Sequence, residues 1–264
     1  MDRSDAVVRL AVLGARGRMG ARCLALAAED PGLEPVLGIV APGEGAGLSA
    51  EGVRLEEGWP SDVEADVLVD FSQPGAVGLA AGWVAERGAA WVCGTTGLED
   101  EHWAKIDGAA ERTPVLWASN FSAVVQTLFV VAAEAARLLG KGYDAEIVEA
   151  HHKHKRDAPS GTALELARRV AEAKGLSPDR DIKLDRQGDD LREASQLTVQ
   201  ALRFGDTPGE HTLVLGGVGE RLELRHQALS RDSYVVGALR AAKWLAGRSA
   251  GRYEMAQVLG IGAS

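Results

Sequence analysis

The chain has 264 residues, which is long enough to bury a substantial core, and we expect two domains of ordinary size. Its composition of 46% hydrophobic and 25% charged residues is typical of globular proteins and excludes a disordered or fibrous chain. The formal net charge of -9 disfavours nucleic acid or an anionic membrane surface as the main partner.

Cysteine content and hydropathy indicate where the protein works. Cys23 and Cys93 are too few for a disulfide framework, and the N-terminal residues lack the apolar run and cleavage site of a signal peptide. The most apolar stretch, Ala123 to Leu139, is interrupted by polar and charged residues and is shorter than the ~20 residues that cross a bilayer. We therefore expect a reduced, cytoplasmic protein without a membrane partner.

Short apolar runs alternate with helical periodicity from Arg9 to about Asn120. The predicted helices are Arg18 to Glu29 and Gly75 to Arg87, and Gly88 is the expected C-terminal cap of the second. The predicted strands are Arg9 to Leu13, Pro35 to Val40, Asp66 to Phe71, Ala90 to Cys93 and Val115 to Ala118. Strands that alternate with helices form parallel sheets, so the pattern predicts a doubly wound α/β domain.

The pattern changes after Asn120. Helices are predicted at Ala123 to Leu139 and Thr162 to Lys174, and apolar residues alternate with polar ones at Leu197 to Ala201 and Leu222 to Leu224. Such alternation is typical of a sheet with one face toward water or a partner, so the second domain is predicted to be α+β. Two further elements are a long loop, Gly175 to Leu191, and a final helix, Tyr234 to Leu245. The sequence alone does not decide on which domain this helix docks.

A glycine-rich loop follows the first predicted strand. The segment LAVLGARGRMGARCLALAAE places Gly14, Gly17 and Gly20 between that strand and the first helix. A pyrophosphate binds a helix N-terminus only where the backbone turns tightly and carries no Cβ near the ligand. The G-x-x-G-x-x-G spacing therefore favours a dinucleotide site, and a tight turn without a ligand is the alternative.

The end of the second strand bears on the choice of dinucleotide. An acidic residue there binds the ribose hydroxyls, whereas an arginine suits a 2′-phosphate. Pro42 and Gly43 occupy these positions, Glu44 is the nearest charge, and Arg16 or Arg18 is an alternative cation. The sequence leaves the choice between NADH and NADPH open.

Two other segments follow strands of the same domain. Gly94, Thr95 and Thr96 in VCGTTGL offer hydroxyl and backbone N–H groups at a carboxyl strand end, where open α/β sheets bind ligands. The segment ASNFS, from Ala118 to Ser122, ends the next strand and leads into the second domain. A plain interdomain hinge is the alternative interpretation of ASNFS.

The segment EAHHKHKRDAPSGTALELA is rich in histidine and basic residues. A strand through AEIVEAHH places His152 and His154 on one face and His151 and Lys153 on the other. A metal site is disfavoured, because carboxylates are scarce there and the basic residues repel a divalent cation. A solvated basic loop is a second alternative.

A third interpretation uses the whole segment. Ser160, Gly161 and Thr162 open a helix, with Thr162 and Glu165 at capping-box spacing. The N–H groups of that helix start and Lys155 form a pocket for a small anion such as a carboxylate. A neighbouring histidine can exchange a proton near neutral pH. Together with the glycine loop, the segment suggests hydride transfer to a carboxylated small molecule.

These segments resemble one enzyme family. EAHHKHKRDAPSGTA, GARGRMG, CGTTG, NFS, GERLELRHQALSR and GALRAAKWLAG occur in the order found in the 4-hydroxy-tetrahydrodipicolinate reductase (dihydrodipicolinate reductase) family, over nearly the whole chain. The resemblance implies a Rossmann-like dinucleotide-binding domain of residues 1–122, completed by 232–264. It further implies a substrate-binding and tetramerisation domain of residues 123–231 with a mixed open sheet, and a homotetramer.

The resemblance also implies roles for individual residues. His151 is similar to the family's acid/base residue and Lys155 to its second proton donor. His152, Gly161 and Thr162 are similar to the group that holds the carboxylates of a small dicarboxylate substrate. The residues similar to the NADH or NADPH contacts are Gly14, Ala15, Arg16, Gly17, Arg18, Met19, Gly94, Thr95, Thr96, Ala118, Ser119, Asn120 and Phe121. The implied chemistry is loss of water, hydride delivery to C4 and protonation at C3 of the ring, in a positive pocket.

The chain departs from the family pattern at two places. Pro42 and Gly43 stand where the family usually has an acidic residue, and Ala123 and Val124 replace a glycine that usually follows NFS. Two alternative functions are a related two-domain NAD(P)-dependent dehydrogenase or imine reductase with another carboxylated substrate, and a non-catalytic dinucleotide-binding sensor. The sensor has no need of His151, which this chain retains.

Overall fold

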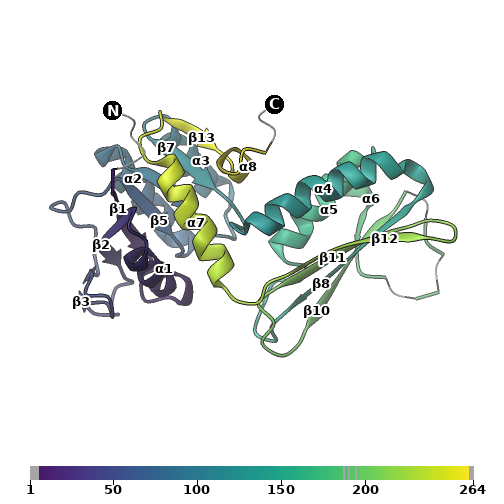
Figure 1. The fold of residues 1–264 in the computed structure, drawn as a ribbon, viewed down its shortest axis with the longest axis horizontal. Helices are drawn as coiled ribbons and strands as arrows, with labels where there is room; N and C mark the ends of the chain where they lie inside the picture. Colours follow the sequence, from purple (N-terminus) through teal and green to yellow (C-terminus); the bar gives the residue numbers. More distant parts are fainter. Residues whose placement is uncertain (1–5, 187, 190, 194, 262–264) are drawn as a thin grey trace. The chain divides into compact units, whose positions relative to one another are not determined.

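The computed structural model of the protein describes residues 6–261 apart from 187, 190 and 194. The chain forms two compact units (Figure 1). Unit 1 comprises Met1–Ser122 and Asp232–Ser264, and unit 2 comprises Ala123–Arg231.

Unit 1 is built on an eight-stranded sheet with the order β13-β7-β6-β5-β1-β2-β4-β3. Its strands are β1 (Val8–Leu13), β2 (Leu33–Ile39), β3 (Gly47–Leu48), β4 (Arg54–Glu56), β5 (Val67–Asp70), β6 (Ala90–Cys93), β7 (Pro114–Trp117) and β13 (Gly251–Tyr253). All neighbouring strands are parallel except β3 and β4. Every residue of β5 and β6 is buried, as in strands covered by helices on both faces.

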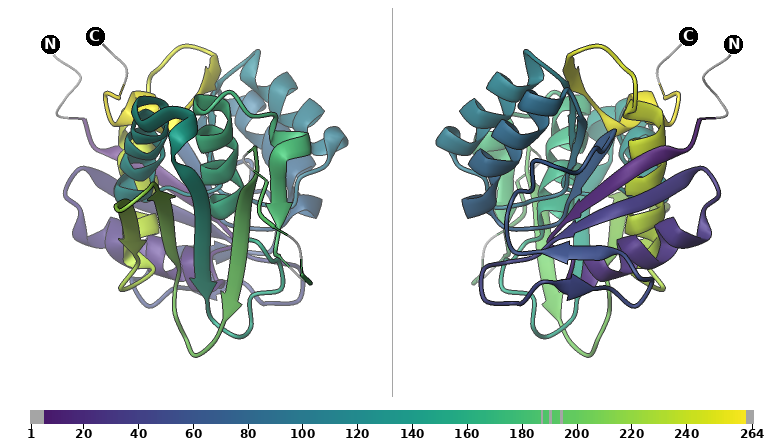
Figure 2. Two further views of the ribbon diagram at one scale, coloured as in Figure 1. Left: turned by 90° about the vertical axis from the view of Figure 1, so that its right-hand side faces the viewer. Right: turned by 90° about the vertical axis from the view of Figure 1, so that its left-hand side faces the viewer.

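Helices cover both faces of this sheet. They are α1 (Arg18–Glu29), α2 (Val77–Arg87), α3 (Asp100–Ala110), α7 (Asp232–Leu245) and α8 (Met255–Val258), with a 3-10 turn at Pro74–Ala76. Helices α1 and α7 share one core cluster with the sheet, whereas α2 and α3 share another on the opposite face (Figure 2). The sheet therefore has the layers of a doubly wound α/β domain.

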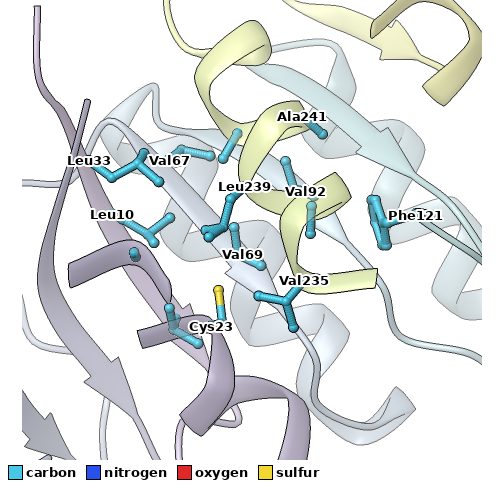
Figure 3. Close-up of a cluster of buried hydrophobic side chains, with 14 of the residues drawn as sticks. Leu10, Cys23, Leu33, Val67, Val69, Val92, Phe121, Val235, Leu239 and Ala241 are labelled. Atoms are coloured by element: carbon cyan, nitrogen blue, oxygen red, sulfur yellow. The ribbon is translucent and has the colours of Figure 1, made fainter. Parts of the chain in front are cut away.

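Helix α7 completes the core of unit 1 although unit 2 separates it from the other helices in the sequence. Val235 and Leu239 of α7 pack in one cluster with Leu10 of β1 and Val69 of β5 (Figure 3). The approach is close at Gly237, where an added Cβ would lie 1.9 Å from the backbone oxygen of Phe121. The final helix, which the sequence alone does not place, thus belongs to unit 1.

Unit 2 contains a five-stranded mixed sheet with the order β12-β11-β8-β10-β9. Its elements are α4 (Ala123–Leu139), a 3-10 turn (Gly140–Gly142), β8 (Asp144–His151), α5 (Gly161–Ala173), α6 (Pro178–Asp181), β9 (Ile182–Leu184), β10 (Leu197–Arg203), β11 (Glu210–Gly216) and β12 (Arg221–Gln227). Strands β8, β9 and β10 are parallel, and β11 is antiparallel to β8 and β12. Helices α4 and α5 lie along one face and bury alternate apolar residues of β8, β10 and β11 (Figure 1).

The structure confirms the predicted fold class and each strand and helix predicted in unit 1, to within two residues at the ends. Gly88 has the left-handed conformation (φ 64°) expected of a C-cap. The prediction of one long loop from Gly175 to Leu191 is wrong in its first part, where α6 and β9 lie; residues 187 and 190 are outside the described residues. Elements of three or four residues are too short to show a period, which is why the sequence does not reveal them.

Helix α4 is unexpectedly apolar for its exposure. The segment Ala123–Gly142 is long and apolar enough to cross a membrane, judged by length and composition alone. Of its apolar stretch, 28% is buried inside the protein. A helix in the core of a globular domain can have the same composition. Val125, Phe129 and Ala132 pack in the core of unit 2, whereas Val124 and Leu138 are exposed. The helix therefore presents one apolar face to the sheet and part of another to its surroundings.

Candidate active site

The glycine loop of unit 1 connects β1 to α1 through a tight turn. Gly14 has a φ of 78°, and its N–H and that of Ala15 both donate to the oxygen of Ile39 on β2. Gly17 is the N-cap of α1 and has no side chain to satisfy the first N–H groups of the helix. An added Cβ at Gly20 would lie 2.1 Å from the oxygen of Gly14. The loop has the close backbone packing and open helix start that a pyrophosphate requires, so these residues fit a dinucleotide.

The other predicted cofactor residues follow strands β6 and β7. Gly94 to Thr96 come directly after β6, and Ala118 to Phe121 come directly after β7. Because β1, β6 and β7 are parallel strands of one sheet, all three loops emerge at its carboxyl edge. This is the edge at which open α/β sheets bind ligands.

Asp70, at the end of β5, organises this edge and was not indicated by the motifs. It is fully buried, and its Oδ1 accepts hydrogen bonds from the hydroxyls of Ser72 (2.6 Å) and Thr95 (3.1 Å). Burial raises the pKa of the Asp70 carboxyl. The hydroxyl of Thr95 is therefore engaged within the protein, which leaves the backbone of this loop for contacts to a ligand.

Carboxylates gather at the end of β2, where the sequence leaves the cofactor choice open. Glu44 folds back and accepts a hydrogen bond from the N–H of Ala41 (3.0 Å). Glu57 accepts from the N–H groups of Gly43 (3.2 Å) and Gly45 (2.6 Å). Arg16 reaches the same loop and donates to the oxygen of Gly45 (2.9 Å). Both an acidic group and a cation are thus present, and the preference between NADH and NADPH stays open.

In unit 2, a row of polar side chains crosses the sheet near the end of β8. Glu149 lies opposite His211 of β11, which in turn lies opposite His226 of β12. His151 lies opposite Arg203 of β10. These residues continue the alternation of the buried apolar positions, so they lie on the face that α4 and α5 cover. The covered face thus changes from apolar to polar toward the carboxyl end of β8.

Glu149 is the most highly coordinated side chain of this row and is 0% exposed. Its Oε1 accepts from the N–H of Ser160 (3.1 Å) and from Arg203 Nη2 (2.8 Å). Its Oε2 accepts from Arg203 Nη1 (3.0 Å) and is hydrogen-bonded to Nδ1 of His151. Burial alone raises the pKa of Glu149, but the hydrogen bonds from His151 and Arg203 outweigh it and bring the pKa to about 2. An ionised carboxylate therefore lies beside His151.

The ionised state of Glu149 determines how His151 is protonated. A carboxylate only accepts hydrogen bonds, so Nδ1 of His151 must carry a proton and donate it. Nε2 is then the ring nitrogen that can exchange a proton with a ligand. The neighbouring rings of His211 and His226 are buried, which lowers the pKa of His211 to about 3 and lowers that of His226. Both are neutral near pH 7, so neither adds a charge next to His151.

Helix α5 starts beside this row. Ser160 is its N-cap, and the Ser160 hydroxyl accepts from the N–H of Ala163 (3.2 Å). The predicted capping box of Thr162 and Glu165 is wrong: the helix begins one residue earlier than expected, so Ser160 takes the cap position. The carboxylate of Glu165 instead pairs with arginines of its own helix. The start of α5, including Gly161 and Thr162, thus lies next to Glu149, and the start of a helix is an environment that favours anions.

The predicted alternation of the histidines stops where β8 ends, at His151. Beyond it the chain turns, and the N–H of Lys155 donates to the oxygen of His152 (3.0 Å). The prediction that His152 and His154 share a strand face is therefore wrong, although their rings are 6.3 Å apart. The Nζ of Lys155 pairs with Asp157 at 2.9 Å. Among residues 6–261, outside the three gaps, no group of three or more His, Cys, Asp or Glu side chains is arranged to hold a metal.

Two sequence families describe the two parts of the chain. Residues 8–121 match the family "Dihydrodipicolinate reductase, N-terminus", and residues 124–259 match "Dihydrodipicolinate reductase, C-terminus". The chain belongs to the dihydrodipicolinate reductase family. The resemblance noted in the motifs is thereby confirmed over nearly the full length.

Individual proteins that are similar to this chain have names that agree with the family. The 4-hydroxy-tetrahydrodipicolinate reductase of Anaeromyxobacter sp. (strain Fw109-5) is 42% identical, over 97% of this chain and 98% of the relative. The enzyme of the same name from Myxococcus xanthus (strain DK1622) is 41% identical, over 97% and 98%. The structure of a dipicolinate-bound dihydrodipicolinate reductase from Paenisporosarcina sp. TG-14 superposes with a TM-score of 0.74 over 94% of this chain and 97% of that chain. At 24% identity, that structure supports the fold.

The sequence motifs of this reductase-family chain do not include every residue of the candidate active site. Arg203, His211 and His226 lie on three other strands, far in sequence from the histidine-rich segment. One feature of the sequence could have revealed these residues: each is a charged or polar residue at an inward-facing position of a strand whose other inward-facing residues are apolar. Strand pairing, which the sequence does not reveal, is what brings them to His151.

Proposed function

We propose that this chain reduces 4-hydroxy-tetrahydrodipicolinate to tetrahydrodipicolinate with loss of water, using NADH or NADPH. The observation that carries the proposal is the arrangement of His151, ionised Glu149 and the start of α5 within a chain of this family. It combines a proton-exchanging imidazole with N–H groups suited to a carboxylate. The substrate offers both a site of protonation and two carboxylates.

Unit 1 is the proposed dinucleotide-binding domain. The loop from Gly14 to Met19 holds the pyrophosphate, and the loops Gly94 to Thr96 and Ala118 to Phe121 contact the rest of the cofactor. The close packing at Gly20 and the open N-terminus of α1 support this assignment. When bound, the cofactor supplies a hydride for C4 of the substrate. The backbone N–H groups of these loops would hold it.

Unit 2 is the proposed substrate-binding domain. His151 is the acid/base residue, and its Nε2 exchanges a proton with the substrate while Glu149 accepts the Nδ1 proton. Lys155 is the second proton donor. His152, with Gly161 and Thr162 at the start of α5, holds the substrate carboxylates. The C4 hydroxyl would leave as water together with a proton from C3, and these residues would return a proton to C3 after reduction at C4, so the net reaction consumes one hydride and one proton and releases one water.

Unit 2 is also the proposed tetramerisation domain, in a cytoplasmic homotetramer. Within the described part of unit 2, helices cover one face of the sheet, and the opposite face has no helix on it (Figure 1). That opposite face carries Val148 and Val214, which are half-buried, and Leu202, which is 48% exposed. The same face also carries charged residues such as Glu146 and Arg225, and an uncovered sheet face that mixes apolar and charged side chains is suited to a second copy of the chain.

A coupled assay tests the proposed reaction. The substrate is generated freshly from its biosynthetic precursors, and loss of nicotinamide absorbance is followed with NADH and, separately, with NADPH. Rapid turnover supports the proposal, and the ratio of the two kcat/KM values gives the cofactor preference. Absence of turnover in protein that binds dinucleotide contradicts it and points to another carboxylated substrate.

A further inference from the structure

One buried carboxylate connects the two halves of the proposed substrate site. Oε2 of Glu149 is bonded to Nδ1 of His151, at the end of β8, and Oε1 accepts the N–H of Ser160, which caps α5. His151 and Ser160 are nine positions apart along the chain. Glu149 therefore links the imidazole directly to the helix start, in addition to the turn that joins them.

Arg203 keeps this carboxylate ionised. Its guanidinium binds both oxygens of Glu149, at 2.8 and 3.0 Å, from the opposite strand β10. Without a cation, a fully buried carboxylate takes up a proton. Arg203 also donates to the backbone oxygen of Asp157 (2.5 Å), in the segment between His151 and Ser160. The same guanidinium thus keeps Glu149 ionised and holds the turn that carries Lys155.

We propose that Glu149 is a positioning residue for the reduction. Its ionised carboxylate holds the proton on Nδ1 of His151, so that Nε2 exchanges the proton with the substrate, and it fixes the start of α5 at the same time. This inference rests on the proposed function, because it assumes that His151 is the acid/base residue. A carboxylate that orients an imidazole in this way affects the rate of proton transfer without touching the substrate.

The charges around His151 define the expected pH effect. Besides Glu149 on its own strand, the groups packed near it are Arg203 on β10, neutral His211 and His226 on β11 and β12, and Lys155 on the following turn. The Glu149 carboxylate is the anion that is hydrogen-bonded to the imidazole, so its removal is expected to change the pH profile of the reaction.

The test compares Glu149→Gln with Glu146→Gln. We expect Glu149→Gln to lower kcat by about 10²-fold or more and to change the pH profile of kcat/KM. Binding of dinucleotide is expected to stay unchanged, since its proposed site is in unit 1. Glu146 is the matched control, because it is on the same strand and pairs with Arg192 at 2.9 Å outside the row. Its variant is expected to retain the native rate and pH profile.

The outcomes separate this inference from the proposed function. A native rate and profile in Glu149→Gln, with a large loss in His151→Gln, overturns the positioning role alone. A native rate in His151→Gln overturns the proposed acid/base role itself. If Glu149→Gln does not fold, 15N NMR of the unmodified protein decides: a neutral His151 protonated on Nδ1 supports the inference, and one protonated on Nε2 overturns it.

Discussion

His211 and His226 stack across β11 and β12, with ring centroids 5.8 Å apart and ring planes inclined by 26°. They are 1% and 4% exposed, respectively, so neither ring is well solvated. The rings of His211 and His151 also form a T-shaped pair, with centroids 5.4 Å apart. Two uncharged imidazoles therefore form one wall around the proposed acid/base residue.

Burial of His211 predicts a loss of stability in acid. Its pKa is about 3 in the folded chain and 6.5 in the unfolded chain, so the unfolded chain binds more protons in between. The contribution of His211 is complete above pH 6.5 and is lost as the pH falls toward 3. At about pH 5.5 the loss is on the order of 1 kcal/mol of unfolding free energy. Urea unfolding at about pH 7.5 and 5.5 should show a smaller pH effect in His211→Gln; equal effects would refute the prediction.

His151→Gln is expected to lower kcat by about 10²-fold or more, because the amide cannot exchange a proton as an imidazole does. Binding of NADH or NADPH, measured by titration of the cofactor fluorescence, should not change. The matched variant is His102→Gln in α3, whose imidazole accepts a local backbone hydrogen bond from Glu99 and lies 3.8 Å from the carboxylate of Glu101. A near-native rate in His151→Gln removes that residue from the mechanism.

Lys155→Ala is expected to lower turnover far more than it alters cofactor affinity, because Lys155 belongs to the unit assigned to the substrate. The amine pairs with Asp157 at 2.9 Å and is 24% exposed, so its loss should cost little stability. Steady-state kinetics and dinucleotide titration measure the two effects. Lys141→Ala, in the 3-10 turn before β8, serves as the control. Equal losses of turnover and cofactor affinity in Lys155→Ala would show that Lys155 does not belong to the substrate site.

Ser160→Ala removes the side chain that caps α5 but keeps the backbone N–H that donates a hydrogen bond to Glu149. We expect about 1 kcal/mol lower stability of the folded chain. The KM for the substrate should rise, since the helix start is less fixed, while kcat falls less than in His151→Gln. Ser177→Ala is the control, because Ser177 caps α6 without a side-chain hydrogen bond. Identical unfolding curves for the two variants would contradict the capping role.

Gly20→Ala is expected to abolish dinucleotide binding or prevent folding of unit 1, because the new Cβ would lie 2.1 Å from the oxygen of Gly14. Gly82→Ala in α2 is the matched change, since no atom lies within 4 Å of an added Cβ there. It should stabilise the helix by about 0.5 to 1 kcal/mol. Cofactor titration and thermal unfolding of both variants measure the contrast. Normal dinucleotide binding by Gly20→Ala would show that the backbone at Gly14 does not approach Gly20 so closely.

Much of unit 1 could be predicted because its information is local. A run such as Ala90 to Cys93 is buried on both faces and shows as an uninterrupted apolar stretch, and Gly88 marks a helix end by its backbone freedom. The same reasoning failed where an element had no period of its own. Strand β9 has three residues and exists because it pairs with β10, a long-range contact that no window of sequence contains.

The sequence by itself determined the alternation of strands and helices, the glycine turn and the cluster of histidines and basic residues, since each depends on neighbouring residues. Only the tertiary structure decided what surrounds His151. Glu149 is close to it in sequence, but Arg203, His211 and His226 come from three other strands. Their proximity follows from strand order and register, and the protonation states of Glu149 and His211 follow from burial beside one another. Both are properties of the packed chain, because an isolated segment has neither a partner strand nor a low-dielectric surrounding.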